Sequence, residues 1–136
     1  MRIAFGADDR NATTAAVLDH LRSAGHTVTV LDESDKWPEI GSMIGHAVVA
    51  GDADYGVVMC WTGTGTAIAA NKVPGCRAAL AWDPWIARGA RLWNDANVLA
   101  LSLKRLAPDV AVEVVQAFLE TTEPDPSEAA NIASLD

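Results

Sequence analysis

Short apolar segments alternate with amphipathic segments of helical length along most of the chain. The apolar runs predict five strands, at residues 2–6, 26–31, 55–60, 77–82 and 97–101. Apolar residues at helical spacing predict helices at about residues 12–24, 40–50, 66–72, 84–93 and 108–120. Because strands and helices alternate strictly, the pattern predicts an α/β fold. We expect a Rossmann-like, three-layer α/β/α sandwich with a five-stranded parallel sheet.

Polar segments mark the turns and the end of the domain. Residues 8–11 form a polar turn that can cap the first helix, and residues 32–39 read as a loop containing Trp37 and Pro38. Residues 1–122 are predicted to form one domain, and residues 123–136 a C-terminal tail. The tail can form a short helix, which we expect to contact a partner subunit.

The segment between the third predicted strand and the next helix contains the most groups that could act in catalysis or ligand binding. It reads Cys60-Trp61-Thr62-Gly63-Thr64-Gly65-Thr66. A cysteine beside a helix N-terminus can act as a base or nucleophile. The glycines let backbone N–H groups converge on an anion, and the threonines supply hydroxyls. Taken alone, a buried structural cysteine beside an ordinary turn explains the segment equally well.

Composition narrows the classes of partner. A net charge of −8 argues against nucleic acid and anionic membranes, which both need a basic surface. The two cysteines and the absence of a secretory leader or a membrane-length apolar run predict a cytoplasmic protein with reduced thiols. The three histidines lack metal-ligand spacing, so we predict no metal.

Several motifs, taken in order, resemble the ribose-5-phosphate isomerase B and galactose-6-phosphate isomerase family of aldose–ketose isomerases. The matching segments are residues 3–8, 60–72, 77–80 and 94–101. The resemblance covers the chain up to about Leu119. It implies a reaction that moves a proton between adjacent carbons of an open-chain sugar through an enediolate. It also implies self-association as a homodimer or tetramer, and no cofactor.

The resemblance assigns roles residue by residue. Cys60 would be the base, Thr62 and the backbone amides of Gly63–Gly65 would bind the enediolate, and Asp8 and Asn94 would hold hydroxyls. The catalytic set is therefore Cys60, Thr62 and Asp8. The expected substrate-binding residues are Asp9, Arg10, Trp61, Gly63, Thr64, Gly65, Thr66, Trp93, Asn94 and Lys104. Two alternatives stay open, namely that Asp8 only caps a helix and that Asn94 is only a turn residue.

This chain departs from the family pattern where the substrate would bind. Asp9 and Trp93 stand where relatives have histidines, the second of which usually opens the sugar ring. Lys104 replaces an arginine, and an acidic segment replaces the arginine-rich C-terminal stretch. Trp61 replaces a glycine. These changes predict a substrate other than ribose 5-phosphate, either a non-phosphorylated sugar or a short-chain sugar that needs no ring opening.

Two functions remain in competition at this level. One is an aldose–ketose isomerase with Cys60 as base. The other is a catalytically inactive subunit that binds a ligand or pairs with an active homologue. Of the tryptophans, Trp61 and Trp93 are expected in the pocket, whereas Trp82 and Trp85 are expected in the core or in an interface.

Overall fold

In the described part of the chain, five strands alternate with five α-helices, and a sixth α-helix follows the fifth. The computed structural model describes residues 1–31 and 33–136. The strands are β1 (Arg2–Ala7), β2 (Thr27–Val30), β3 (Tyr55–Cys60), β4 (Ala78–Leu80) and β5 (Val98–Ser102). The α-helices are α1 (Ala12–Ser23), α2 (Trp37–Val49), α3 (Thr64–Asn71), α4 (Pro84–Asn94), α5 (Pro108–Glu120) and α6 (Ala129–Ala133), with a 3₁₀ turn, η1 (Pro126–Glu128), before α6.

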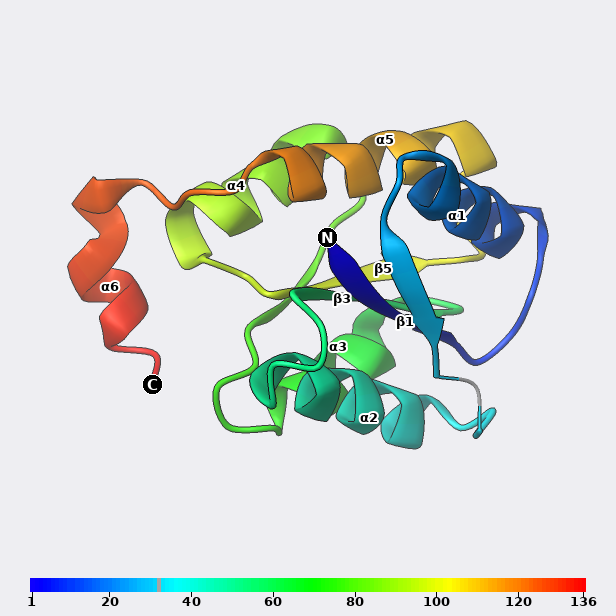
Figure 1. Cartoon of the computed structure of the whole chain (residues 1–136), viewed down its shortest axis with the longest axis horizontal. Coiled ribbons are helices and arrows are strands. Elements are labelled where there is room, and N and C mark those ends of the chain that lie inside the picture. Colours follow the sequence, from blue (N-terminus) through cyan, green and yellow to red (C-terminus); the bar gives the residue numbers. More distant parts are fainter. Residues whose placement is uncertain (32) are drawn as a thin grey trace.

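The strands form one parallel sheet in the order β2-β1-β3-β5-β4. The helices α1, α4 and α5 cover one face, and α2 and α3 cover the other (Figure 1). Each face has its own apolar core, one around Phe5, Leu21 and Phe118 and one around Ile40, Ile44 and Val58. The predicted α/β/α sandwich is confirmed. After β1 the chain turns outward to β2 and then returns past β1 to β3, so the carboxyl ends of β1 and β3 form the switch point where ligands of such folds bind.

Several boundaries differ from the sequence prediction. Helix α2 begins at Trp37 rather than near residue 40, because Pro38 lies in its first turn, where a missing N–H is no loss. The predicted loop at residues 32–39 is therefore partly helical, and its Asp32 lies outside the described residues. Helix α1 is capped by Asn11, whose side chain accepts the N–H groups of Thr13 and Thr14. Strand β3 and helix α5 have the predicted bounds.

Close packing of α2 on α3 positions one wall of the switch point. A Cβ atom on Gly41 would lie 2.7 Å from the carbonyl oxygen of Thr66 in α3. Only glycine allows the helices to approach this closely. The approach carries the first turn of α2 to the start of α3, where the ring of Trp37 lies against Gly65. A loop residue in the sequence prediction thus becomes part of a rigid helix pair.

The tail follows α5 and ends in the predicted short helix. Its first residues are tied down, since the N–H of Asp125 donates to the carbonyl of Leu92 at 2.7 Å. Helix α6 then lies beside α4 and away from the sheet (Figure 1). Arg77 reaches the C-terminal residue, with 3.3 Å between its Nη1 and a carboxylate oxygen of Asp136. None of the described helices is long and apolar enough to cross a membrane.

Candidate active site

A cavity of about 390 Å³ lies at the carboxyl ends of β1 and β3. Its lining combines a thiol, a carboxylate, two hydroxyls and two indoles, and consists of Asp8, Trp37, Cys60, Trp61, Thr62, Thr64 and Gly65. The side chains of five of these were predicted from the sequence to act in catalysis or substrate binding, namely Asp8, Cys60, Trp61, Thr62 and Thr64. The backbone of Gly63 and the hydroxyl of Thr66 join the group through their contacts with the Cys60 sulfur.

The Cys60 thiol is held at the floor of this cavity. Its side chain is only 4% exposed, and its Sγ accepts a hydrogen bond from the N–H of Gly63 at 3.2 Å. The hydroxyl of Thr66 lies 3.4 Å from the same sulfur and 3.3 Å from the carbonyl oxygen of Gly63. Because a threonine hydroxyl has one hydrogen, it donates to one of these two acceptors at a time. The turn therefore fixes the sulfur at the end of β3.

The turn itself depends on Gly63. This residue has φ +79°, and a Cβ atom there would lie 2.6 Å from a methyl group of Leu80 and 2.9 Å from the backbone of Leu101. Both the backbone conformation and the space require glycine.

Replacement of Gly63 by alanine is expected to destabilise the fold and impair the site. The positive φ alone costs about 1–2 kcal/mol, and the contacts with Leu80 and Leu101 add about 1–3 kcal/mol. The matched control is Gly25→Ala, because Gly25 also has positive φ but has nothing within 4 Å of the added carbon. Urea unfolding of both variants measures the difference. Equal losses would show that the space around Gly63 is less restricted than the structure indicates.

The first turn of α3 presents free amide groups. The N–H of Thr64 donates to Oγ1 of Thr62 at 3.3 Å, and that of Gly63 donates to Cys60. The N–H groups of Gly65 and Thr66 have no acceptor among the described residues, as is usual in the first turn of a helix without a side-chain cap. These amides, the positive end of the helix dipole and the linked hydroxyls of Thr62 and Thr64, 2.7 Å apart, form a binding place for a developing oxyanion.

Asp8 lines the cavity and carries an unsatisfied carboxylate oxygen. Its backbone N–H donates to the carbonyl of Met59 at 3.2 Å, which ties β1 to β3 at this edge. Its Oδ1 is buried and lacks a hydrogen-bond partner within the described part of the chain. Burial, together with the charge of Asp9, raises the pKa of the Asp8 carboxyl. Asn11 does the capping of α1, so the interpretation of Asp8 as a simple helix cap is not supported.

Asp8→Asn is expected to raise the free energy of unfolding at pH 7. Because the pKa of Asp8 is raised on folding, the folded state binds its proton more tightly, and the ionised form costs stability above that pKa. The advantage of asparagine should shrink as the pH falls and vanish below about pH 4. Asp54→Asn is the control of opposite sign, since hydrogen bonds from Arg2 lower the pKa of Asp54. Urea unfolding at pH 7 and pH 4 measures both, and a destabilised Asp8→Asn at pH 7 would contradict the prediction.

Asp9 and Lys104 both contact the Trp61 side chain, Asp9 at the indole N–H and Lys104 over the ring. The indole N–H of Trp61 donates to Oδ2 of Asp9 at 3.0 Å, and the Nζ of Lys104 lies 4.6 Å from the ring centroid. Hydrogen bonds from the backbone of Arg10 and from Trp61 lower the pKa of Asp9. The hydroxyl of Ser102, a residue that sequence analysis did not single out, donates to the backbone carbonyl of Trp61.

Trp93 and Asn94 lie away from this cavity. Trp93 packs over Gly89 and contacts Trp85 edge to face, with ring centroids 5.5 Å apart. Asn94 ends α4, just before β5 begins, and lines a separate hollow with Arg77 at the amino edge of the sheet. Since Cys60 pairs with Ser102 at the far end of β5, the length of β5 alone separates the two edges by about 13 Å. One chain does not bring these residues to Cys60.

Among the other tryptophans, Trp37 is a residue of the cavity that the predicted substrate-binding set lacks. It lies near Gly65 only because α2 and α3 pack closely, a contact that no local pattern reveals. Trp82 and Trp85, expected in a core or an interface, are not part of the core and are exposed in the single chain.

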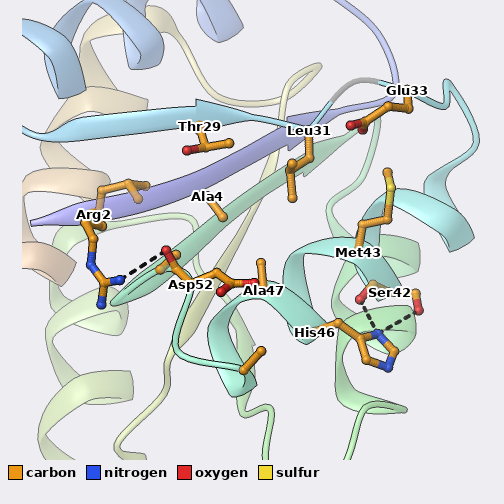
Figure 2. A pocket seen from close by; sticks show the side chains of 13 residues that line it. Arg2, Ala4, Thr29, Leu31, Glu33, Ser42, Met43, His46, Ala47 and Asp52 are labelled. Carbon is orange, nitrogen blue, oxygen red and sulfur yellow. Dashed lines mark hydrogen bonds between the residues drawn. The ribbon is translucent and has the colours of Figure 1, made fainter.

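A larger cavity, of about 550 Å³, lies elsewhere (Figure 2). It lies beside the packing of α2 on the sheet, and residues of α2, β1 and β2 line it. The guanidinium of Arg2 at one end is occupied by Asp54 and by backbone carbonyls, and the imidazole of His46 at the other contacts the carbonyl of Ser42 at 2.8 Å. It contains none of the predicted site residues. No cluster of three or more His, Cys, Asp or Glu side chains in residues 1–31 and 33–136 can hold a metal.

Comparison with known proteins identifies the family of the chain. The family described as Ribose/Galactose Isomerase matches residues 3–135. The chain belongs to this family. Its members are sugar phosphate isomerases, and the chain is accordingly an enzyme of the aldose–ketose isomerase class. The family resemblance drawn from the sequence motifs is confirmed.

Individual relatives resemble the chain over most of its length. D-erythrulose-4-phosphate isomerase of Pectobacterium atrosepticum is 35% identical over 126 residues, which are 88% of this chain and 83% of that protein. Galactose-6-phosphate isomerase subunit LacB of Clostridium acetobutylicum is 36% identical over 108 residues, 76% of this chain and 62% of that protein. The structure of ribose-5-phosphate isomerase B from Clostridium thermocellum superposes with a TM-score of 0.88 at 33% identity, over 99% of this chain and 95% of that chain.

Proposed function

We propose that the chain isomerises a short-chain sugar phosphate, a tetrose 4-phosphate, with Cys60 as the base. The main support for this reaction is the position of the Cys60 sulfur. It lies in the cavity beside the amides of Gly65 and Thr66, which have no acceptor among the described residues. A base at one side of a sugar and donors for an oxyanion at the other are what an enediolate mechanism needs.

The residues divide the chemistry among them. The Cys60 thiolate removes the proton from C2 of the aldose, and the electron pair moves to the carbonyl, whose oxygen becomes the enediolate oxyanion. The amides of α3 and the hydroxyl of Thr62 stabilise that charge. Asp8, whose raised pKa suits exchange of a proton, moves the hydroxyl proton from O2 to O1. The proton on Cys60 then returns to C1, which gives the ketose and restores the thiolate.

The choice of a four-carbon substrate follows from the lack of a ring opener. By resemblance, Trp93 stands where relatives have a histidine, and an indole N–H can donate a hydrogen bond but cannot serve as an acid–base catalyst. A tetrose phosphorylated on O4 has no hydroxyl that can close a five-membered ring, so its isomerase needs no ring opening. The similarity to a D-erythrulose-4-phosphate isomerase supports the same chain length.

We propose Lys104 as the cation that binds the phosphate. Its ammonium lies over the ring of Trp61, a residue of the cavity, and makes no ion pair within 4 Å among the described residues, although its charge helps to lower the pKa of Asp9. Arg10 and Arg105 are further cations near this edge in sequence. A local cation is needed because the net charge of −8 gives no general attraction for a phosphate.

We propose that the active unit is at least a homodimer in the cytoplasm. Trp93 and Asn94 lie at the opposite edge from Cys60, so they can reach a Cys60 cavity only in a second copy. The exposed pair Trp85 and Trp93 on α4 is the kind of aromatic surface that dimers bury. The tail from residue 123 is proposed to contact the partner as well. Light scattering at micromolar concentration should give a dimer or tetramer, and a monomer would refute this part of the proposal.

A substrate panel tests the reaction. Phosphorylated and free tetroses, pentoses and hexoses are incubated with the chain, and exchange of the C2 proton for deuterium is followed. We expect tetrose 4-phosphate turnover that inorganic phosphate inhibits, and kcat/KM for ribose 5-phosphate below about 10⁴ M⁻¹s⁻¹. Efficient ribose 5-phosphate turnover would overturn the substrate choice. Activity that appears only with an added homologue would favour a paired subunit, as the name of the LacB relative suggests for that protein.

A further inference from the structure

Polar contacts hold the Trp61 side chain in place although it is mostly exposed. Its side chain is 57% exposed and belongs to neither apolar core cluster. Yet Asp9 accepts its indole N–H at 3.0 Å, Lys104 lies 4.6 Å from its ring centroid, and Ser102 binds its backbone carbonyl. A large exposed side chain with two polar contacts, on a backbone that Ser102 anchors, contributes little to folding by burial, so its orientation needs another explanation.

The contacts of Trp61 determine what it offers to a ligand. The ring lines the Cys60 cavity, and its N–H is its only hydrogen-bonding group. Because Asp9 already occupies that N–H, the part of the indole that faces the cavity offers only carbon. A hydroxyl placed against this wall would lose its hydrogen bonds to water and gain none in return.

We propose that Trp61 sets the length of the substrate by excluding sugars with an additional hydroxyl-bearing carbon. This inference rests on the proposed function and adds the residue that selects chain length. With the carbonyl end at Cys60 and the phosphate at Lys104, whose ammonium lies over the Trp61 ring, the proposed substrate lies along that ring. In this placement a four-carbon chain presents fewer hydroxyls to the wall than a five-carbon chain. A five-carbon chain must place one more hydroxyl against the indole.

Three variants test the role of the ring. Trp61→Ala should raise the ratio of kcat/KM for five-carbon to four-carbon aldose phosphates at least tenfold, because it removes the carbon wall. Trp61→Phe keeps an aromatic wall and should preserve the preference for four carbons. Trp82→Ala is the matched control, since Trp82 is 60% exposed but does not line the cavity, and its ratio should stay unchanged. Circular dichroism checks that each variant is folded.

A binding measurement separates this inference from the proposed reaction. The phosphorylated sugar acids with four and five carbons bind without reacting, and their dissociation constants are measured by calorimetry for the parent chain and Trp61→Ala. We expect the parent chain to prefer the four-carbon acid at least tenfold and the variant to lose that preference. An unchanged preference in Trp61→Ala would overturn the role of Trp61, whatever the turnover. A shifted preference in a chain that isomerises no tetrose phosphate would support the role of Trp61 in length selection and refute the proposed reaction.

Discussion

Replacement of Cys60 by serine is expected to lower kcat by about 10²- to 10⁴-fold while leaving the fold intact. The sulfur is the proposed base, and a serine hydroxyl is a far weaker acid that stays protonated near neutral pH. The fold should survive because an oxygen can accept the same hydrogen bonds from Gly63 and Thr66. The measurement is initial-rate kinetics together with circular dichroism and thermal unfolding of the variant.

Cys76 supplies the matched control. It is the second free cysteine of the described residues and lies buried in the core between the sheet and the helices α2 and α3. Burial raises the pKa of its thiol to about 11, so it stays protonated at neutral pH. Cys76→Ala should therefore retain turnover near that of the parent chain. A fully active Cys60→Ser would exclude Cys60 as the base and leave the Asp8 carboxylate as the candidate base in the cavity.

Replacement of Arg91 by alanine is expected to lower the free energy of unfolding by about 3–5 kcal/mol. Arg91 is 3% exposed, and its Nη1 lies 2.7 Å from the carboxylate of Asp95. The same guanidinium donates to the carbonyls of Ala96, Thr121 and Thr122. Its removal leaves Arg77 as the remaining partner of the Asp95 carboxylate and takes the arginine donor from three carbonyls, and it weakens the hold on the start of the C-terminal tail.

The rings beneath Arg91 add to the loss. Its guanidinium carbon lies 4.8 Å from the ring centroid of Tyr55 and 5.8 Å from that of Phe118, so the arginine also caps the core on this face. Arg88→Ala is the matched control on the same helix, since Arg88 is exposed and, among the described residues, makes only a long contact with the carbonyl of Pro84. Urea unfolding measures both variants. A loss for Arg91→Ala no larger than for Arg88→Ala would show that the tail is not held by Arg91.

Much of the fold follows from local pattern. Strand β3 and helix α5 have the bounds that their apolar periodicity predicts, because period two and period 3.6 are properties of neighbouring residues. The glycine turn after Cys60 could also be predicted from the sequence, since a positive φ at Gly63 is a local requirement of the backbone. The errors fall at element ends. Trp37 and Pro38 read as a loop but begin α2, where tertiary packing on α3 supports the first helical turn.

The site needed the tertiary structure. The sequence placed Asp8 and Cys60 at the carboxyl edge of the sheet, but the unpaired Asp8 oxygen and the Trp61 contacts with Asp9 and Lys104 join residues from separate turns. The sequence likewise assigned Asn94, as a substrate-binding residue, to the same site as the catalytic Cys60, and the register of β5 places the two at opposite edges.

The sequence by itself determined the order and type of the elements and the chemistry of the Cys60 turn. Only the tertiary structure decided that Trp37 lies over Gly65, that the buried Arg91 packs over the ring of Tyr55, and that Asn94 is far from Cys60 in one chain. The physical reason is that periodicity and turn chemistry act over a few residues. Which side chains meet is set instead by strand order, register and helix packing, which join residues far apart along the chain.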